Sequence, residues 1–476
     1  MFSTRQIFRI SRGSGGARGL SGPARARASR TARTALAVAT ASTLALTAAA
    51  CGGDGDSDEK DSGKKSAPSV ELPDLKGQKL QVGAVWTGAE EKNFRAVLDE
   101  FEERTGAKVS FVPTGDSIAT YLSTKIEGGS PPDVAMLPQV GALRQFAEKG
   151  WIKPVSNDVQ KQLDKNYSDG WRDLGTYKDK QYGVYFKVAN KSLIWYNTAA
   201  FENAGVSEPK TWKEFLEVAK TVSASGVAPV SVGGEDGWTL TDWFENVYLS
   251  QAGPEKYDQL ADHEIKWTDP SVGEALETLG ELFGDKTLIA GGQSGALQTS
   301  FPKSVTQTFT GGDQPKAAMV YEGDFVAGNI SADTDAEVGK DAKVFPFPAV
   351  GENSPVVSGG DVAVALKDTE GAQALMTFLA STDAAEIWAE AGGFISPNKE
   401  LDLDSYTDEV QRDIAEALIE AGDDFRFDMS DQAPAAFGGT KGEGEWKALQ
   451  DFLKNPKDVK GAQQQLEAAA AKAYKN

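Results

Sequence analysis

Residues 80–112 read LQVGAVWTGAEEKNFRAVLDEFEERTGAKVSFV, and this stretch decides the fold class. Residues 80–85 alternate as a β-strand does, and residues 109–112 return to a strand pattern. Between them, apolar side chains recur at helical spacing at Phe94, Val97, Leu98 and Phe101. Gly106 follows at the position where a left-handed helix cap is expected. The stretch therefore predicts a βαβ unit, in which a helix connects two parallel strands.

The same alternation of strand and helix continues along the chain. A helical stripe over residues 118–126 precedes a strand at 133–137, and another helix begins at Val140. A second α/β region begins near Lys191; its expected elements are a strand at 193–196, a helix over 212–222, a strand at 229–232, a helix over 275–283, strands at 317–321 and 362–366, and a helical C-terminal part. This pattern predicts open α/β sheets, which bind ligands beyond the carboxyl ends of their strands.

Chain length and composition narrow the class of protein. About 400 residues follow the N-terminal segments, more than one core usually organises, so two lobes are expected. The net charge of −21 falls to about −29 without the arginines of the first 33 residues, which argues against nucleic-acid binding. The single histidine, His263, is interpreted as a surface residue in a turn. No Walker A loop or GxGxxG fingerprint is present, and no cofactor is expected.

The N-terminal 50 residues have the organisation of a secretory signal. Eight arginines and no acid lie in the first 33 residues, and residues 34–50 are uncharged and rich in alanine, leucine and valine. The only cysteine, Cys51, follows three alanines and precedes two glycines, as in a bacterial lipoprotein signal. We expect lipidation of Cys51 to make it a membrane anchor; the alternative is a spare cysteine in an ordinary signal peptide.

A polar segment follows Cys51. Residues 52–69 consist mainly of Gly, Asp, Ser, Lys and Pro without apolar periodicity, so residues 51–77 are expected to form a flexible linker. Its acids Asp54, Asp56 and Asp58 lack the glycine and the glutamate that complete a calcium loop, and no metal site is expected.

The loops after the expected strands combine aromatic side chains with carboxylates and amides. Examples are WTGAEE at 86–91, GGEDGWTLTDW at 233–243, EGDF at 322–325 and FRFDMSD at 425–431. Sugar hydroxyls need directional hydrogen bonds, and the apolar face of a sugar ring packs on a flat aromatic ring. These loops therefore favour a carbohydrate ligand.

Several of these residues have a structural alternative. Trp195, Trp212 and Trp388 lie within apolar strand or helix patterns and are expected in the core. Trp238 stands in a Gly-rich loop, where it either packs internally or stacks on ligand. Asp242 and Glu90 are interpreted either as ligand contacts or as first-turn acids of the helices that follow them.

Four segments carry a family resemblance: IEGGSPPDVA at 126–135, KSLIWYN at 191–197, GWTLTDW at 237–243 and FRFDMSD at 425–431. Together they resemble the extracellular solute-binding proteins of ABC sugar importers, best the α-glucoside-binding branch, over the chain from about Gln78 to its end. Leu240 departs from that branch, which typically has glycine there.

The resemblance implies a type II clamp like that of periplasmic binding proteins, with two α/β lobes, each an open sheet flanked by helices, and a hinge of crossover segments. One lobe is expected at 78–186 plus 359–397, the other at 187–358 plus 398–476. It also implies that sugar binds between the lobes. The implied ligand-binding residues are Glu90, Asp116, Gln139, Lys187, Trp238, Asp242, Asp324, Asp361, Arg426 and Asp428.

The implied function is capture of a carbohydrate, an α-linked di- or trisaccharide, and its delivery to membrane permease subunits served by a separate ATPase. The protein is expected to be a monomer, held by Cys51 at the outer face of the cytoplasmic membrane, and not an enzyme. The alternatives are a surface glycosidase, since carboxylates are plentiful, and a polysaccharide-docking lipoprotein without a transporter.

Overall fold

The computed structural model describes residues 69–351, 354, 356–421 and 425–475. The expected signal segment, Cys51 and the linker up to residue 68 lie outside these residues. No helix in the described part of the chain combines the length and apolar character needed to cross a membrane. The structure describes the last part of the expected linker, residues 69–77. In it, Leu75 is buried, and Ser69 Oγ and Val70 N donate hydrogen bonds to Asp383 at 2.8 and 3.1 Å.

The predicted βαβ unit is confirmed. Strands β1 (Lys79–Ala84) and β2 (Lys108–Pro113) are parallel, and α1 (Gly88–Thr105) connects them. All four apolar residues of the helical stripe are buried. Gly106 has φ 73° and its N–H donates to Glu102 O, so the left-handed cap is present where it was expected.

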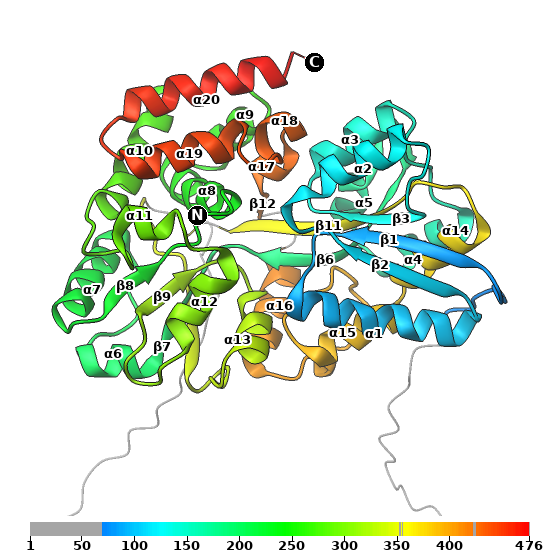
Figure 1. The fold of residues 1–476 in the computed structure, drawn as a ribbon, viewed down its shortest axis with the longest axis horizontal. Coiled ribbons are helices and arrows are strands. Elements are labelled where there is room, and N and C mark those ends of the chain that lie inside the picture. Colours follow the sequence, from blue (N-terminus) through cyan, green and yellow to red (C-terminus); the bar gives the residue numbers. More distant parts are fainter. Residues whose placement is uncertain (1–68, 352–353, 355, 422–424, 476) are drawn as a thin grey trace, which may run out of the picture. The chain divides into compact units, whose positions relative to one another are not determined.

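The first sheet has the strand order β12-β11-β3-β1-β2, with β6 also paired to β11 (Figure 1). Its further strands are β3 (Val134–Leu137), β6 (Gly183–Asn190), β11 (Val357–Ala365) and β12 (Arg426–Phe427). Both β3 and β6 run antiparallel to β11. Strand β11 starts earlier than the expected 362–366, because Gly359 and Gly360 interrupt the apolar pattern but not the pairing.

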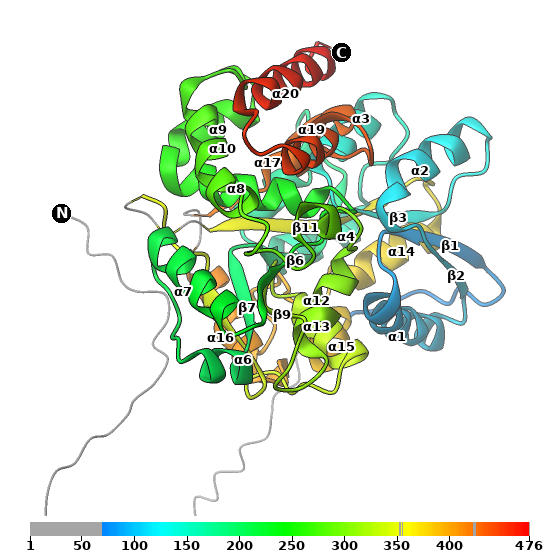
Figure 2. The same ribbon diagram turned by 60° about the vertical axis from the view of Figure 1, so that its left-hand side comes forward.

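Helices cover both faces of this sheet. The chain passes from β1 to β2 in one direction and returns past β1 to β3, so right-handed connections place α1 and α2 (Ile118–Glu127) on opposite faces. Figures 1 and 2 show α2 with α3 (Val140–Glu148) on one side and α1 with α15 (Thr382–Ala391) on the other. Trp388 of α15 is buried, as expected, and packs edge-on against Trp86 at 4.8 Å.

The second sheet has the order β10-β7-β9-β8. Its strands are β7 (Leu193–Asn197), β8 (Ala228–Ser231), β9 (Ala317–Tyr321) and β10 (Ala342–Pro346). Its helices include α6 (Thr198–Ala204), α7 (Trp212–Ala224), α8 (Trp238–Ala252) and α10 (Pro270–Phe283). Trp195 and Trp212 are buried in this part of the molecule, which confirms their predicted core role. The expected mixed α/β architecture with sheets flanked by helices is thus observed.

The chain crosses between the two sheets at β6–β7 and at β10–β11. These crossings are bonded to each other: Lys191 N donates to Val357 O at 2.8 Å, and Val357 N donates to Ser192 Oγ at 2.8 Å. The two crossing segments, near Lys191 and Val357, are therefore paired with each other where the chain passes between the sheets.

Smaller elements complete the described chain. They are η1 (Gly115–Ser117), α4 (Asn157–Asn166), α5 (Asp169–Leu174), β4 (Thr176–Tyr177), β5 (Lys180–Gln181), α9 (Pro254–Ala261), α11 (Gly292–Ala296), α12 (Phe301–Phe309), α13 (Val326–Asp333), α14 (Glu370–Leu379), η2 (Leu403–Ser405), α16 (Glu409–Ala421), α17 (Met429–Gln432), α18 (Ala435–Gly438), α19 (Gly444–Lys454) and α20 (Val459–Ala473). His263 lies in the turn after α9 as predicted, but it is half-buried: it packs on Tyr474 and lies 3.3 Å from Glu467.

Candidate ligand-binding site

A cavity of about 380 Å³ lies where loops from both sheets meet. One part of its wall comes from the loops after β1, β2 and β3 and includes Trp86, Asp116 and Gln139. The other part comes from the loop before α8, the start of α12 and the start of α17. The crossing strands β6 and β11 contribute Lys187 and Asp361. This position beyond the carboxyl ends of the strands is the one expected for a ligand in an α/β fold.

Lys187 lines the cavity near the first sheet and pairs there with an acid. Its side chain is buried, and its Nζ lies 2.7 Å from Glu90 Oε1. Burial alone lowers the pKa of Lys187, but the carboxylates of Glu90, Asp361 and Asp324 raise it overall, so it remains charged. Asp361 accepts a hydrogen bond from Trp86 Nε1 at 3.1 Å, and burial raises the pKa of its carboxyl to about 6. Glu90 is indeed in the first turn of α1, and it faces the cavity as well.

Lys441 joins the two sides of the cavity at its edge. Its Nζ lies 3.3 Å from Asp116 Oδ2, on the side of the first sheet, and 3.2 Å from Asp236 Oδ1, in the loop before α8. Burial and the neighbouring Asp236 raise the pKa of Asp116, and Lys441 opposes this. Gln139 adds an amide whose Oε1 is buried without a protein partner, so it is available to a ligand hydroxyl.

The cavity lining includes the aromatic residues Trp86, Trp238, Phe301, Phe325 and Trp446, and three of these rings form a cluster. Trp238, Phe301 and Phe325 have ring centroids between 5.3 and 6.2 Å apart. Trp238 is the first residue of α8, where the sequence predicted a loop residue preceding the helix. A lining that combines flat rings with carboxylates and amides offers both an apolar surface and hydrogen-bond acceptors to one ligand.

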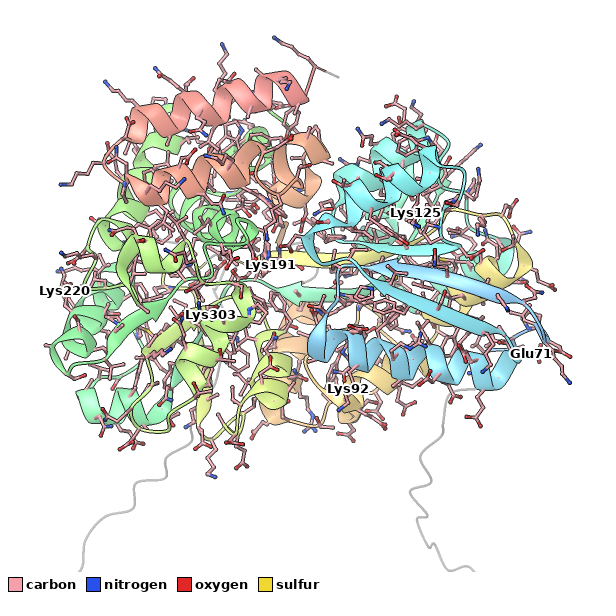
Figure 3. The ribbon with its side chains drawn as sticks, in the orientation of Figure 1. Glu71, Lys92, Lys125, Lys191, Lys220 and Lys303 are labelled. Carbon is pink, nitrogen blue, oxygen red and sulfur yellow. The ribbon has the colours of Figure 1, made fainter. Side chains whose placement is uncertain are left out.

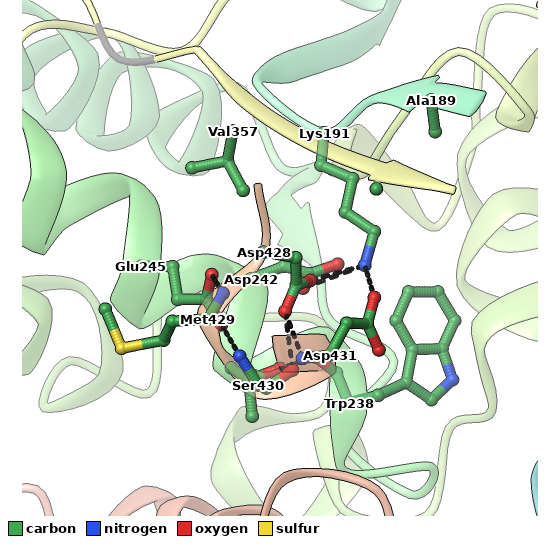
Figure 4. Close-up of polar contacts among 12 residues, drawn as sticks. Ala189, Lys191, Trp238, Asp242, Glu245, Val357, Asp428, Met429, Ser430 and Asp431 are labelled. Atoms are coloured by element: carbon green, nitrogen blue, oxygen red, sulfur yellow. Dashed lines mark hydrogen bonds and ion pairs between the residues drawn. The ribbon is translucent and has the colours of Figure 1, made fainter. Parts of the chain in front are cut away.

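Lys191 lies near the ring of Trp238 and within ion-pair distance of three carboxylates (Figure 4). Its Nζ lies 2.5 Å from Asp428 Oδ2 and 3.4 Å from both Asp431 Oδ2 and Asp242 Oδ1. The ammonium is also 5.8 Å from the ring centroid of Trp238. Figure 3 shows Lys191 near the centre of the molecule next to β11, and Lys220 at its edge. Lys191 and Asp431 line the cavity, so this network forms part of its floor.

Further buried acids surround the Lys191 network. Burial raises the pKa of Asp242 to about 8 and raises the pKa values of Glu245, Glu322 and Glu445 well above the usual range for a glutamate. Asp428 differs: burial opposes its ionisation, but the contact with Lys191 lowers its pKa below the ordinary value. The lysine is therefore paired with an ionised Asp428, while the acids behind it hold protons.

Three of these acids, Asp242, Glu245 and Asp428, bring carboxylate oxygens within 4.8 Å of one another, the spacing of a metal site. However, the backbone N–H groups of Met429 and Ser430 donate to Glu245 at 2.8 and 3.0 Å. Asp428 accepts from Ser430 Oγ at 2.7 Å and is paired with Lys191. These contacts use the oxygens that a cation would need, so the donor set does not fit a metal ion.

The structure separates the predicted ligand-binding residues into two groups. Six line the cavity: Glu90, Asp116, Gln139, Lys187, Trp238 and Asp361. Four do not: Asp242, Asp324, Arg426 and Asp428. Asp242 and Asp428 are fully buried behind Lys191, and Asp324 is buried with its Oδ1 accepting from Asn190 N at 2.7 Å. Arg426 pairs with Asp258 of α9 at 2.8 Å.

The polar lining residues that were not predicted include Lys191, Asp236, Asp333, Ser430 and Asp431. Lys191, Asp236, Ser430 and Asp431 lie within segments or loops that the sequence analysis quotes. Lys191 begins the KSLIWYN segment, so a lysine at the start of an otherwise apolar strand was the available signal.

Comparisons with known proteins agree with this architecture. A family model described as bacterial extracellular solute-binding protein matches residues 86–386. The osmoprotective compounds-binding protein GgtB of Synechocystis is 33% identical over 79% of this chain and 89% of its own length. The alpha-glucosides-binding periplasmic protein AglE of Rhizobium meliloti is 32% identical over 80% of this chain and 84% of its own. The solved bacterial solute receptor AcbH, with 19% identity, superposes with a TM-score of 0.71 over 83% of this chain and 99% of its own. The predicted clamp fold is therefore confirmed.

Proposed function

The chain belongs to the family of bacterial extracellular solute-binding proteins, and we propose that it captures a carbohydrate outside the cytoplasmic membrane and delivers it to the permease subunits of an ABC importer. The observation that carries the proposal is the cavity itself, whose lining combines the rings of Trp238, Phe301 and Phe325 with carboxylates and an amide. A sugar ring needs both surfaces at once: its C–H face packs on a ring, and its hydroxyls donate to the acceptors.

We propose an α-linked di- or trisaccharide of glucose as the ligand. Support comes from the name of AglE, an α-glucoside-binding relative, and from the GWTLTDW and FRFDMSD segments, which supply Trp238 and Asp431 to the cavity. The name of GgtB, an osmoprotective compounds-binding relative, shows that relatives of this chain are not restricted by name to α-glucosides, so the panel of candidate sugars has to be broad.

In the proposed mechanism the ligand closes two lobes, 78–186 plus 359–397 and 187–358 plus 398–476, and no bond is made or broken. Closure is driven by differential affinity, because only the closed form completes hydrogen bonds from both walls. The crossings at Lys191 and Val357 act as the hinge. X-ray scattering with and without saturating sugar tests this: identical dimensions in the two states would contradict closure.

We also propose that the protein is a monomer, anchored through lipidated Cys51 at the outer face of the membrane, with residues 52–68 as a tether. Mass spectrometry of the membrane-associated protein tests this directly. Replacement of Cys51 by serine is expected to release the protein from the membrane fraction without changing its affinity for sugar.

The decisive experiment is calorimetric titration with maltose, maltotriose, trehalose, sucrose and palatinose, with a β-linked glucoside as control. We expect one-to-one binding of an α-linked sugar, with loss of about 1–3 kcal/mol of binding free energy for Trp238→Ala, the range for an aromatic stacking contact with a ring. The matched control is Trp151→Ala, because Trp151 does not line the cavity. Prolonged incubation with chromogenic α-glucosides should give no turnover. Absence of binding by every sugar would overturn the carbohydrate assignment.

A further inference from the structure

The charge distribution around the cavity points to a rule about which saccharides it accepts, and this rule rests on the proposed function. Six acids line the cavity: Glu90, Asp116, Asp236, Asp333, Asp361 and Asp431. Among the described residues, the lining includes two lysines, Lys187 and Lys191, and no arginine. The wall therefore carries an excess of acidic over basic groups.

Every cation at the cavity already has a carboxylate partner. Lys187 is paired with Glu90 at 2.7 Å, and Lys191 with Asp428 at 2.5 Å. Lys441, at the edge, lies within 3.3 Å of both Asp116 and Asp236. An anionic group on a ligand would have to displace one of these carboxylates to reach a positive charge.

The groups buried behind the wall do not offset its acidic excess, because none of them is a cation. Asp242, Asp324, Glu245, Glu322, Asp428 and Glu445 are all buried next to the lining residues. Several of them hold protons at neutral pH, so they add little negative charge, but they contribute no compensating cation either. Coulomb interactions inside a partly desolvated cavity are several times stronger than in water.

We propose that the cavity is a charge-selective saccharide site, which binds neutral and amino-bearing sugars and rejects sugars that carry a carboxylate or a phosphate. An ammonium group in place of a hydroxyl keeps the ability to donate hydrogen bonds and adds attraction to the acidic wall. A carboxylate removes a donor and meets carboxylates for which no free cation is present. Rejection by an unfavourable charge is a general device for specificity.

The test compares three versions of one disaccharide by calorimetry at low ionic strength: maltose, its 6′-carboxylate and its 6′-amino-6′-deoxy derivative. We expect the amino derivative to bind at least about tenfold more tightly than the carboxylate, with the ratio falling as salt screens the charges. A smaller ratio, including an equal loss for both derivatives, would show that size and not charge decides and would overturn the proposal.

A pair of variants links this ratio to the wall. Glu90→Gln removes the carboxylate that is ion-paired with the Lys187 ammonium, so the ratio should shrink at least about threefold. Glu91→Gln, the next residue of α1 and not part of the lining, should leave the ratio unchanged. An unchanged ratio in Glu90→Gln would contradict the role of the paired lysine.

A second measurement needs no sugar and separates this proposal from the proposed function. Trp238 lines the cavity, so its fluorescence, taken as the difference between the wild-type protein and Trp238→Phe, should be quenched by caesium more than by iodide at equal ionic strength, once each quenching constant is divided by that of free tryptophan amide. Stronger quenching by iodide would overturn the charge selection. If maltose fails to bind, the proposed sugar is wrong, and the quenching result still decides the charge rule.

Discussion

Removal of the Lys191 charge should destabilise the protein far more than removal of any exposed lysine. The substitution Lys191→Met keeps most of the aliphatic stem and deletes the ammonium that lies 2.5 Å from Asp428 and 3.4 Å from Asp431 and Asp242. All four side chains are at most 12% exposed. Removing one partner of a buried ion pair typically costs about 3–5 kcal/mol, because the remaining charge is left unpaired in the interior.

The pH dependence of this loss provides the sharper test. In wild-type protein, Lys191 lowers the pKa of Asp428, so the stabilising contribution of this pair is present at neutral pH and is lost only in strong acid. In Lys191→Met, burial without the cation raises the pKa of Asp428, and protonation then relieves the unpaired charge as the pH falls. The deficit of the variant should therefore be largest at pH 7 and smaller at pH 5.

The assay is denaturant unfolding of both proteins at pH 7 and pH 5, with midpoints and slopes compared. Lys220→Met on the exposed side of α7 is the matched control and should change the unfolding free energy by no more than about 0.5 kcal/mol. A loss below about 1 kcal/mol at pH 7, or an equal loss at both pH values, would refute the view that Lys191 compensates a buried charge.

Three further predictions concern neighbouring features. Burial raises the pKa of Asp242 from 3.8 to about 8, so the stabilising effect of its bound proton is complete only below pH about 4 and is lost progressively as the pH rises through 8; Asp242→Asn should flatten the fall in unfolding free energy between pH 6 and pH 9. A Cβ on residue 359 would lie 2.6 Å from Lys191 Cε, so Gly359→Ala should cost about 1–3 kcal/mol in denaturant unfolding, and additivity with Lys191→Met would contradict this cause. Asp383→Ala removes the acceptor of Ser69, Val70 and Arg104, so limited proteolysis near residue 70 should become faster, while unchanged digestion would argue against that anchor.

Local patterns in the sequence predicted most of the sheet-forming elements. The stripe from Phe94 to Phe101 and the cap at Gly106 depend on neighbouring residues alone, and both are present. The early start of β11 was missed, because Gly359 and Gly360 have low strand propensity, and the pairing with β6 overrides that propensity.

The site was predictable only in part, since burial of an acid depends on distant segments. Trp238 was proposed from its Gly-rich segment and Asp361 from the family resemblance, and the structure places both in the cavity lining. Asp242 lies in an equally polar segment but is buried beside Lys191, 51 residues earlier, and burial raises the pKa of its carboxyl to about 8. The contact between Lys191 and Asp431 spans 240 residues, and no local pattern indicates it.

The strip of backbone from Lys187 to Lys191 has an evolutionary consequence. Its two lysines lie four residues apart, and each is bonded to acids from a different wall: Glu90 at the start of α1, and Asp428 and Asp431 beside α17. Surface loops on either wall can be lengthened or exchanged separately, because each ends at its own strand or helix. An insertion of one residue within the strip would change the spacing of the two lysines, so at least one of them would lose its register with its acids. Ligand preference in this fold can therefore diversify through the surface loops of either wall. A change within residues 187–191 requires matching changes in both walls.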